Sequence, residues 1–159
     1  MWTLLCVASA SALHLHTGAQ LRPATCPPAR DVRMGPSPKL KELVMKVMTD
    51  HESITFASAI DAIESNYDVV PVPFSVGSVE SAAGENMGSA KILSAGKMLM
   101  LSSEVTLWLF GEIYRDVLNT PEGIDHPNIR AFMEGGWDAV SFPDGLCLRD
   151  KAPNTIDVS

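Results

Sequence analysis

Apolar side chains recur every three or four residues over the first part of the domain, which is the spacing of one face of an α-helix. The pattern runs from Leu40 to Val47, with lysines and a glutamate on the other face. It returns from Phe56 to Ile63 and ends near Asn66. The spacing therefore predicts two amphipathic helices.

Farther along the chain, similar patterns predict three more helices. One covers residues 91–101. Ser102 is suited to cap a long helix over residues 105–118, whose apolar opening VTLWLF indicates burial on most sides. The last helix is expected to begin at Asp125, as the N-cap before a proline in the first turn, and to end at the glycine pair 135–136.

Two segments have the composition of β-structure. Residues 67–76 are rich in valine, but Pro71 and Pro73 lack the N–H that a central strand donates, so an extended loop or a sheet edge is expected. Residues 137–142 alternate, and residues 146–149 are expected to return beside them after a Pro-Asp-Gly turn. The predicted fold class is α+β: a mostly α-helical single domain with a short C-terminal β-hairpin.

The beginning of the chain has a different composition from the rest. Residues 1–12 carry a short apolar run that ends in alternating small residues, as in a signal peptide. Residues 13–34 combine three arginines with Ala, Thr and Pro, which is typical of a transit peptide. This order resembles the leaders of proteins imported into secondary plastids of algae. It predicts a plastid protein, with the stroma favoured, and simple secretion is the alternative.

The remaining chain is expected to hold one domain over residues 38–150 and a flexible tail over 151–159. Of the 12 Lys and Arg and the 19 Asp and Glu, three and one lie in the leader, which leaves 9 bases, 18 acids and a net charge of −9. Phosphate backbones and anionic lipid would repel such a domain. Nucleic acid is therefore excluded as a partner, and no direct membrane insertion of the mature domain is expected.

Ionisable side chains crowd the segment between two apolar runs near residue 120. Glu112 and Asp116 are four residues apart, so both carboxylates would project from one helical face. Asp125 and His126 follow after a Pro-Gly loop that could bring the imidazole back to this face. Such a set could hold a divalent ion or work as an acid and base.

A purely structural interpretation of the same segment stays open. In it, Asp125 caps a helix, and Arg115 or Arg130 pairs with Asp116. His126 then only fixes the loop. Spacing alone does not decide between the two interpretations.

A second polar cluster spans residues 85–91. Asn86 can adopt the left-handed conformation, and Ser89 is a possible helix cap. In a functional interpretation, Asn86, Ser89 and Lys91 bind a ligand or an anion at a helix start. In a structural interpretation, the cluster only begins a helix.

Both clusters lie in two long stretches, AGENMGSAKIL and LSSEVTLWLFGEIYRDVLNTPEGIDHPNIRAFMEGGWDAVSF. These stretches closely resemble the HopJ type III effector domain family, and the resemblance runs from about Lys39 to Leu148. It implies that both clusters belong to the signature of one domain, and it implies no particular reaction. The leader lies outside the resemblance.

The combined site is predicted to use Asp116 and His126 as a catalytic or metal-binding pair. The ligand-binding residues are predicted to be Asn86, Ser89, Lys91, Tyr114, Arg115, Asp125, Asn128 and Arg130. One hypothesis is a soluble plastid domain that binds a small molecule or acts on it. The other is a non-catalytic module that binds a plastid protein or complex. The sequence specifies no cofactor and no metal, and it leaves open whether the protein is an enzyme.

Overall fold

The computed structural model describes residues 37–151, and the following account concerns this part of the chain. The predicted leader segments 1–12 and 13–34 and the tail residues 152–159 lie outside it. The helices are α1 (Pro38–Thr49), α2 (Phe56–Asn66), α3 (Met87–Met98), α4 (Ser103–Trp108), α5 (Glu112–Asn119) and α6 (Pro127–Gly135), with 3₁₀ turns at His51–Ser53 and Gly136–Ala139. Helices thus dominate, which confirms the predicted class of a mostly helical α+β domain.

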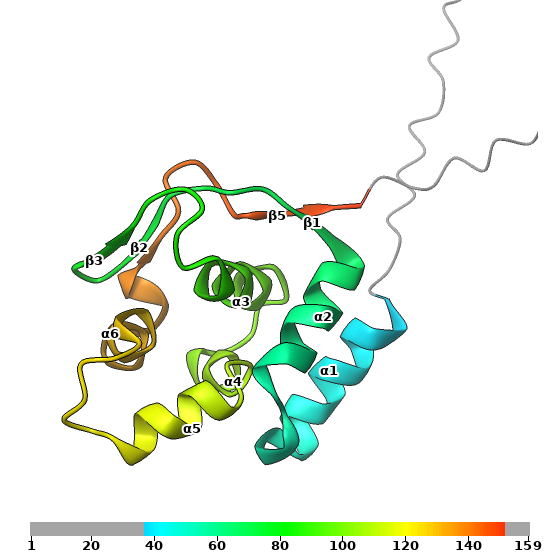
Figure 1. Cartoon of the computed structure of the whole chain (residues 1–159). Coiled ribbons are helices and arrows are strands. Elements are labelled where there is room, and N and C mark those ends of the chain that lie inside the picture. The colour runs from blue at the N-terminus through cyan, green and yellow to red at the C-terminus, as the bar shows by residue number, and fades with distance from the viewer. Residues whose placement is uncertain (1–36, 152–159) are drawn as a thin grey trace, which may run out of the picture. The chain divides into compact units, whose positions relative to one another are not determined.

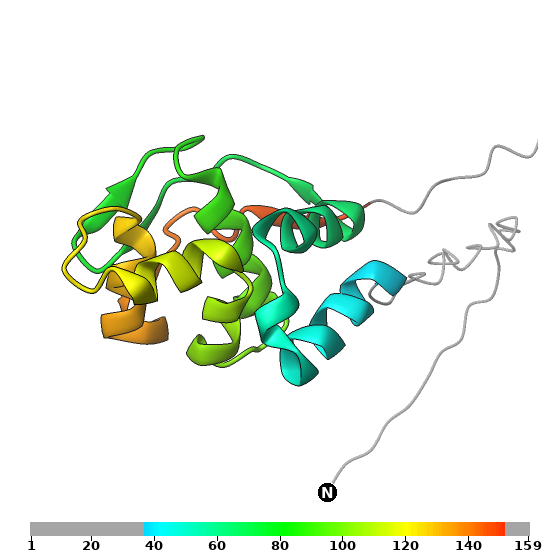
Figure 2. The same cartoon turned by 60° about the horizontal axis from the view of Figure 1, so that its bottom comes forward.

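The helices surround α3 (Figure 1). Helices α1 and α2 pack side by side on one flank, and α2 contacts α3. Helix α4 packs against α1, α3 and α6, and α6 lies on the side of α3 away from α1 and α2. Both views place α5 between α6 and the first turns of α2 (Figure 2). The starts of α2, α3, α5 and α6 therefore come near one another.

The first two helices form where their spacing predicted them. Ser37 caps α1 by accepting a hydrogen bond from the Leu40 N–H at 3.2 Å. Thr55 and Ser58 form a reciprocal capping box at the start of α2. The apolar stripe of α1, including Leu40, is buried against α2. Sequence periodicity and tertiary packing agree here.

The prediction of one long helix over residues 105–118 is wrong, because the chain forms two helices, α4 and α5, in this region. The chain breaks at Gly111, whose φ of +59° lies in the region that favours glycine. A Cβ on this residue would lie 2.5 Å from the Phe56 backbone nitrogen. Leu109 and Phe110 are buried just before the break, so the apolar pattern continues through it. In the sequence, Gly111 itself is the only sign that the helix is interrupted here.

The strands are β1 (Tyr67–Val69), β2 (Phe74–Val76), β3 (Val79–Ser81), β4 (Val140–Ser141) and β5 (Leu148–Asp150). One antiparallel sheet has the order β3-β2-β4, and a second pairs β1 with β5. The predicted C-terminal hairpin is therefore wrong, because β4 pairs with β2 and β5 pairs with β1. Strands β4 and β5 each pair with a strand from the middle of the chain, and their apolar residues Val140 and Leu148 are buried there.

Residues 67–76 match the expected loop or edge only in part, because β1 is an edge strand and β2 is not. Strand β1 ends before Pro71, and β2 begins after Pro73. Both prolines thus stand between strands, where no ladder hydrogen bond is lost. Strand β2 then takes the central place in its sheet.

The core is continuous from α1 to β5 and is anchored by Phe110 and Phe132, which are 1% and 0% exposed. Trp137 packs edge-on against Phe132 and donates its Nε1–H to the Leu101 carbonyl at 2.9 Å. Between residues 37 and 151, no helix is long and apolar enough to span a membrane.

Candidate functional site

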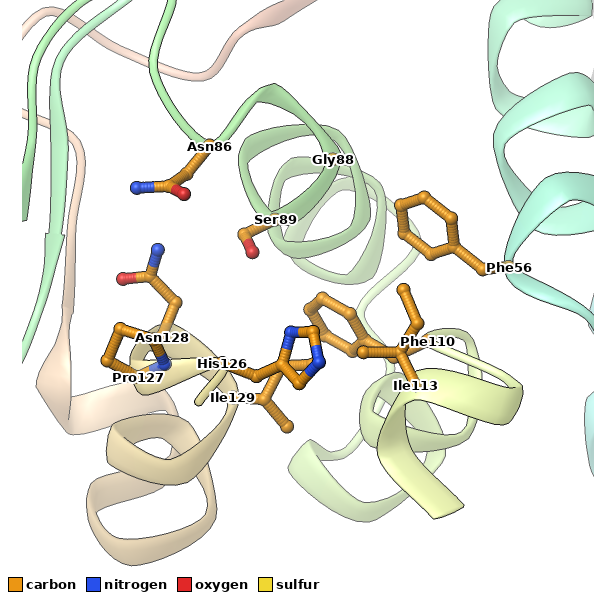
Figure 3. A pocket seen from close by; sticks show the side chains of 10 residues that line it. All are labelled: Phe56, Asn86, Gly88, Ser89, Phe110, Ile113, His126, Pro127, Asn128 and Ile129. Carbon is orange, nitrogen blue, oxygen red and sulfur yellow. The ribbon is translucent and has the colours of Figure 1, made fainter. Parts of the chain in front are cut away.

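A cavity of about 180 Å³ opens where the first turns of α3 and α6 face each other (Figure 3). Asn86, Ser89 and Asn128 lie on one side of it, and aromatic and aliphatic side chains lie on the other. His126 stands between the two groups. The full lining is Phe56, Asn86, Gly88, Ser89, Phe110, Ile113, His126, Pro127, Asn128 and Ile129.

The start of α3 is shaped by Asn86 and Gly88. Asn86 is the N-cap in the left-handed conformation, with φ +47°, and no side chain caps this helix. Its Nδ2 instead donates to Ser81 Oγ at 2.9 Å. A Cβ at Gly88 would lie 2.6 Å from Phe56 Cζ, so glycine allows α2 and α3 to approach.

The start of α6 is shaped by His126, which is its N-cap with φ +50°. The prediction that Asp125 caps this helix is wrong, because Arg130 holds the Asp125 carboxylate at 2.5 Å and the Asp125 carbonyl at 2.8 Å. The hydrogen bond from the Arg130 guanidinium lowers the pKa of Asp125. His126 Nε2 lies 3.7 Å from Asp125 Oδ2, on the rim of the cavity.

Ser81 joins the two helix starts, and sequence reasoning missed it. It is 3% exposed, and its Oγ accepts from both Asn86 Nδ2 and Asn128 Nδ2, the latter at 3.4 Å. Asn128 is 4% exposed, and its Oδ1 has no hydrogen-bond partner in the described part of the chain. Asn128 therefore keeps hydrogen-bonding capacity beside the cavity.

Four of the ten predicted site residues line the cavity: Asn86, Ser89, His126 and Asn128. Lys91 lies outside it and pairs with Glu64 at 2.6 Å. Arg115 Nη1 donates to the Ile54 carbonyl at 3.1 Å. These two cations therefore hold α2 and the turn before it.

Tyr114, Asp116, Asp125 and Arg130 also stand apart from the cavity lining. Tyr114 is buried with its ring edge-on to Trp108, and burial, with Glu104 nearby, raises its pKa. Asp116 is exposed, and within residues 37–151 no ion pair joins it to His126 or to an arginine. The catalytic pair Asp116 and His126 stays a prediction.

The apolar wall was also missed, because Phe56 lies more than 50 residues before Phe110 and Ile113 and only the fold brings them together. Each reads along the sequence as an ordinary core residue. Over the described residues, no group of three or more His, Cys, Asp and Glu side chains is placed to hold a metal ion.

A family model described as HopJ type III effector protein matches residues 40–146. The chain belongs to the HopJ family. The resemblance inferred from the two signature stretches is thereby confirmed.

This HopJ domain is also similar to a crystal structure of an unknown-function protein, VPA0580. The two sequences are 39% identical, the match covers 74% of this chain and 98% of that chain, and the TM-score is 0.69. Among curated proteins, no sequence matches the chain. The fold is therefore shared with that protein.

Charge is unevenly placed around the helix starts of the HopJ domain. Glu112, in the first turn of α5, accepts the Phe56 N–H of α2 at 2.8 Å through Oε2. One carboxylate thus serves two helix N-termini, where the helix dipole favours negative charge. Helices α3 and α6 have no acidic residue in their first turns.

Proposed function

We propose that this HopJ domain binds a small molecule in the cavity between the starts of α3 and α6. The observation that carries the proposal is the joining of both polar clusters at one hollow with an apolar wall. Concave sites that combine apolar walls with a few convergent polar groups are typical of ligand pockets. We assign ligand contacts to Asn86, Ser89, His126 and Asn128.

The size of the cavity limits the ligand. An engineered cavity of about 150 Å³ in another protein holds one benzene molecule. The present cavity, at about 180 Å³, has room for one ring or a short alkyl chain beside Phe56 and Phe110. A larger ligand would extend past His126, and the predicted catalytic pair of Asp116 and His126 would matter only if such a ligand also contacted Asp116.

The proposal predicts that filling the cavity abolishes binding. In the full chain, Ser89→Leu places a branched side chain in the hollow, whereas Ser65→Leu makes the same change near the end of α2. A compound that binds only the folded state raises the melting temperature. At a free concentration of 100 times its Kd, it stabilises the folded state by about 2.7 kcal/mol. A metabolite panel should therefore shift the wild type and Ser65→Leu but leave Ser89→Leu unchanged.

The same panel distinguishes small-molecule binding from the alternative function, in which the domain is a non-catalytic interaction module of a plastid complex. Exposed apolar side chains near the α5–α6 loop favour this alternative: Leu118 is 44%, Met133 40% and Ile124 95% exposed. If no compound shifts the wild type, or if Ser89→Leu shifts equally, the cavity is not the binding site. The search would then turn to protein partners at this loop.

Plastid import is part of the proposal and rests on the composition of residues 1–34. We expect the full chain, fused at its C-terminus to a fluorescent protein, to enter the stroma in an alga with a secondary plastid. Deletion of residues 13–34 should leave the fusion in the secretory pathway. Secretion of the undeleted fusion would instead support the alternative address.

A further inference from the structure

We infer that a groove between α5 and α6 docks a basic amphipathic helix of a protein partner. This surface is separate from the cavity between the starts of α3 and α6. The inference therefore goes beyond small-molecule binding, because either site can work without the other.

The groove lies between the last turns of α5 and α6 and has a volume of about 220 Å³. It shares no lining residue with the cavity. A cavity of about 150 Å³ holds one benzene molecule in another protein, so an apolar side chain of a partner fits here. The lining of this α5–α6 groove is Val117, Leu118, Pro121, Arg130, Met133 and Glu134.

Large apolar side chains are exposed at the groove. Leu118 and Met133, from the two facing helices, are 44% and 40% exposed. Ile124, three residues after Pro121 in the loop that joins the helices, is 95% exposed. Apolar side chains that gather on a polar surface mark interaction sites, because a partner that covers them removes apolar surface from water.

The charge of this part of the chain is negative. Residues 98–148 contain eight acids, two arginines and no lysine, which gives a net charge of −6. Both arginines are engaged within the domain, since Arg115 donates to a backbone carbonyl before α2 and Arg130 holds the loop aspartate. Glu122 and Glu134 are exposed, and neither pairs with a lysine or arginine among residues 37–151. Their carboxylates are therefore open to cations from outside.

The helix backbones add to this negative potential. Leu118 lies in the last turn of α5, and Met133 lies in the last turn of α6. The carbonyl groups of a last turn carry the negative end of the helix dipole, which favours a nearby cation. Neither helix has a basic residue in its last turn. A lysine or arginine of a partner would fill this role.

These properties together specify the partner. A hollow between two helices suits an amphipathic helix, which inserts apolar side chains spaced three or four residues apart. Lysines or arginines beside those side chains would meet Glu122 and Glu134. A second copy is a poor occupant because each copy carries a net charge of −9 over residues 35–159, and like charges repel.

The test is fluorescence anisotropy of a labelled peptide titrated with the full chain. The probe is a designed helix of about 15 residues, with two leucines four residues apart, flanking lysines and alanine elsewhere. Replacing its leucines by alanine, or its lysines by glutamate, should weaken binding by about tenfold or more. The Kd of the original peptide should rise with salt.

Variants of the domain locate the binding. Met133→Ser and Glu134→Lys should each weaken binding of the peptide by about tenfold. Met45→Ser on α1 and Glu52→Lys in the following 3₁₀ turn make the same changes away from the groove, so both should bind as wild type does. All four side chains are exposed, and the variants should therefore stay folded.

Several results would overturn the inference. They are no binding of the peptide, equal binding of its leucine-free version, and equal binding by Met133→Ser and Met45→Ser. Sedimentation of the chain alone provides a further check, because self-association that Met133→Ser abolished would assign the groove to a second copy.

The cavity variant keeps this inference apart from the proposed function. Ser89→Leu should bind the peptide as wild type does, even though it loses the small molecule. If Ser89→Leu abolished binding of the peptide, the peptide would occupy the cavity, and the groove would not be its site. A metabolite panel without any binder would leave the expected peptide results unchanged.

Discussion

One arginine holds the loop between α5 and α6 in place. Arg130 Nη2 contacts the Asp125 carboxylate at 2.5 Å and Thr120 Oγ1 at 3.1 Å, and its Nε contacts the Asp125 carbonyl. The guanidinium thus joins the beginning and the end of the loop. Two of the charged residues in this segment, Asp125 and Arg130, therefore stabilise the loop.

This ion pair predicts a pH dependence. Because the Arg130 hydrogen bond lowers the pKa of Asp125 below its ordinary value of 3.8, the pair stabilises the folded state above that value. The contribution fades as pH falls below about 4 towards the lowered pKa. Asp125→Asn should therefore melt slightly earlier than wild type at neutral pH, and the difference should shrink on acidification.

Thermal melts between about pH 7 and pH 3 would measure this effect. Asp116→Asn is the matched control, since it removes a nearby carboxylate without breaking this pair. A gap between wild type and Asp125→Asn that stayed constant with pH would show that the pair does not stabilise the loop.

Residue types predicted some local conformations and missed others. The left-handed conformation of Asn86 was expected from its side chain, and the structure confirms it. Asp125 was expected to cap α6, but the arginine five residues later competes for its carboxylate. Which of two local partners an aspartate takes depends on loop geometry that residue types do not contain.

At the scale of elements, the break between α4 and α5 builds one wall of the cavity. Gly111 turns the chain so that Phe110 and Ile113, on either side of the break, both line the hollow. The break also starts α5 at Glu112, whose carboxylate accepts the Phe56 N–H of α2.

Gly111→Ala should therefore be strongly destabilising, by roughly 3 kcal/mol or more, because a positive φ and a backbone clash add together. Gly84→Ala is the matched control, since Gly84 also has a positive φ but a Cβ added there would meet no atom within 4 Å. Its cost should be about 1–2 kcal/mol, the cost of the left-handed conformation for a residue with a side chain. Urea unfolding would measure both, and equal losses would show that the contact with α2 carries no energy.

Helix periodicity predicted most of the helices but not where they are interrupted. Apolar residues lie on both sides of Gly111 because the core surrounds this region, so the pattern contains no gap. The hairpin failed for a related reason. Short strands pair with whichever edge the rest of the fold offers, and here those edges are some 65 to 80 residues earlier in the chain.

At the scale of the whole molecule, strand β5 completes the core by pairing with β1. Strand β5 pairs with β1 in the register Val69 to Leu148, and the Cys147 N–H donates to Ser94 Oγ on α3 at 3.1 Å. Leu148 is 2% exposed. The last element is thus part of the same core as the first helices.

Leu148→Ala should lower the free energy of unfolding by about 2–5 kcal/mol, as expected for a buried leucine. Urea unfolding should keep a single transition with an unchanged slope. Leu118→Ala, at a position 44% exposed, should cost less than about 1 kcal/mol. A separate early transition in Leu148→Ala would show that β5 unfolds independently.

At this scale the sequence predicted the class of fold and part of the site. The polar residues of the cavity lie in two motifs that can be recognised locally, Asn86 to Ser89 and His126 to Asn128. Its apolar wall combines Phe56 with Phe110 and Ile113, which lie on either side of the break at Gly111, and no local pattern marks it. Charge type alone also suggested Lys91 and Arg115, whose partners on α2 and beside it only the fold could reveal.

The two ends of the described domain meet at the junction of α2 and β1. The Ser37 N–H donates to Asn66 Oδ1 at 2.6 Å, and Asp150 stands opposite the neighbouring Tyr67 (Figure 1). Domains with adjacent ends can be circularly permuted or inserted into a loop of another protein. A short linker from residue 150 to residue 37, with new ends at the exposed Gly84, should therefore leave the fold intact.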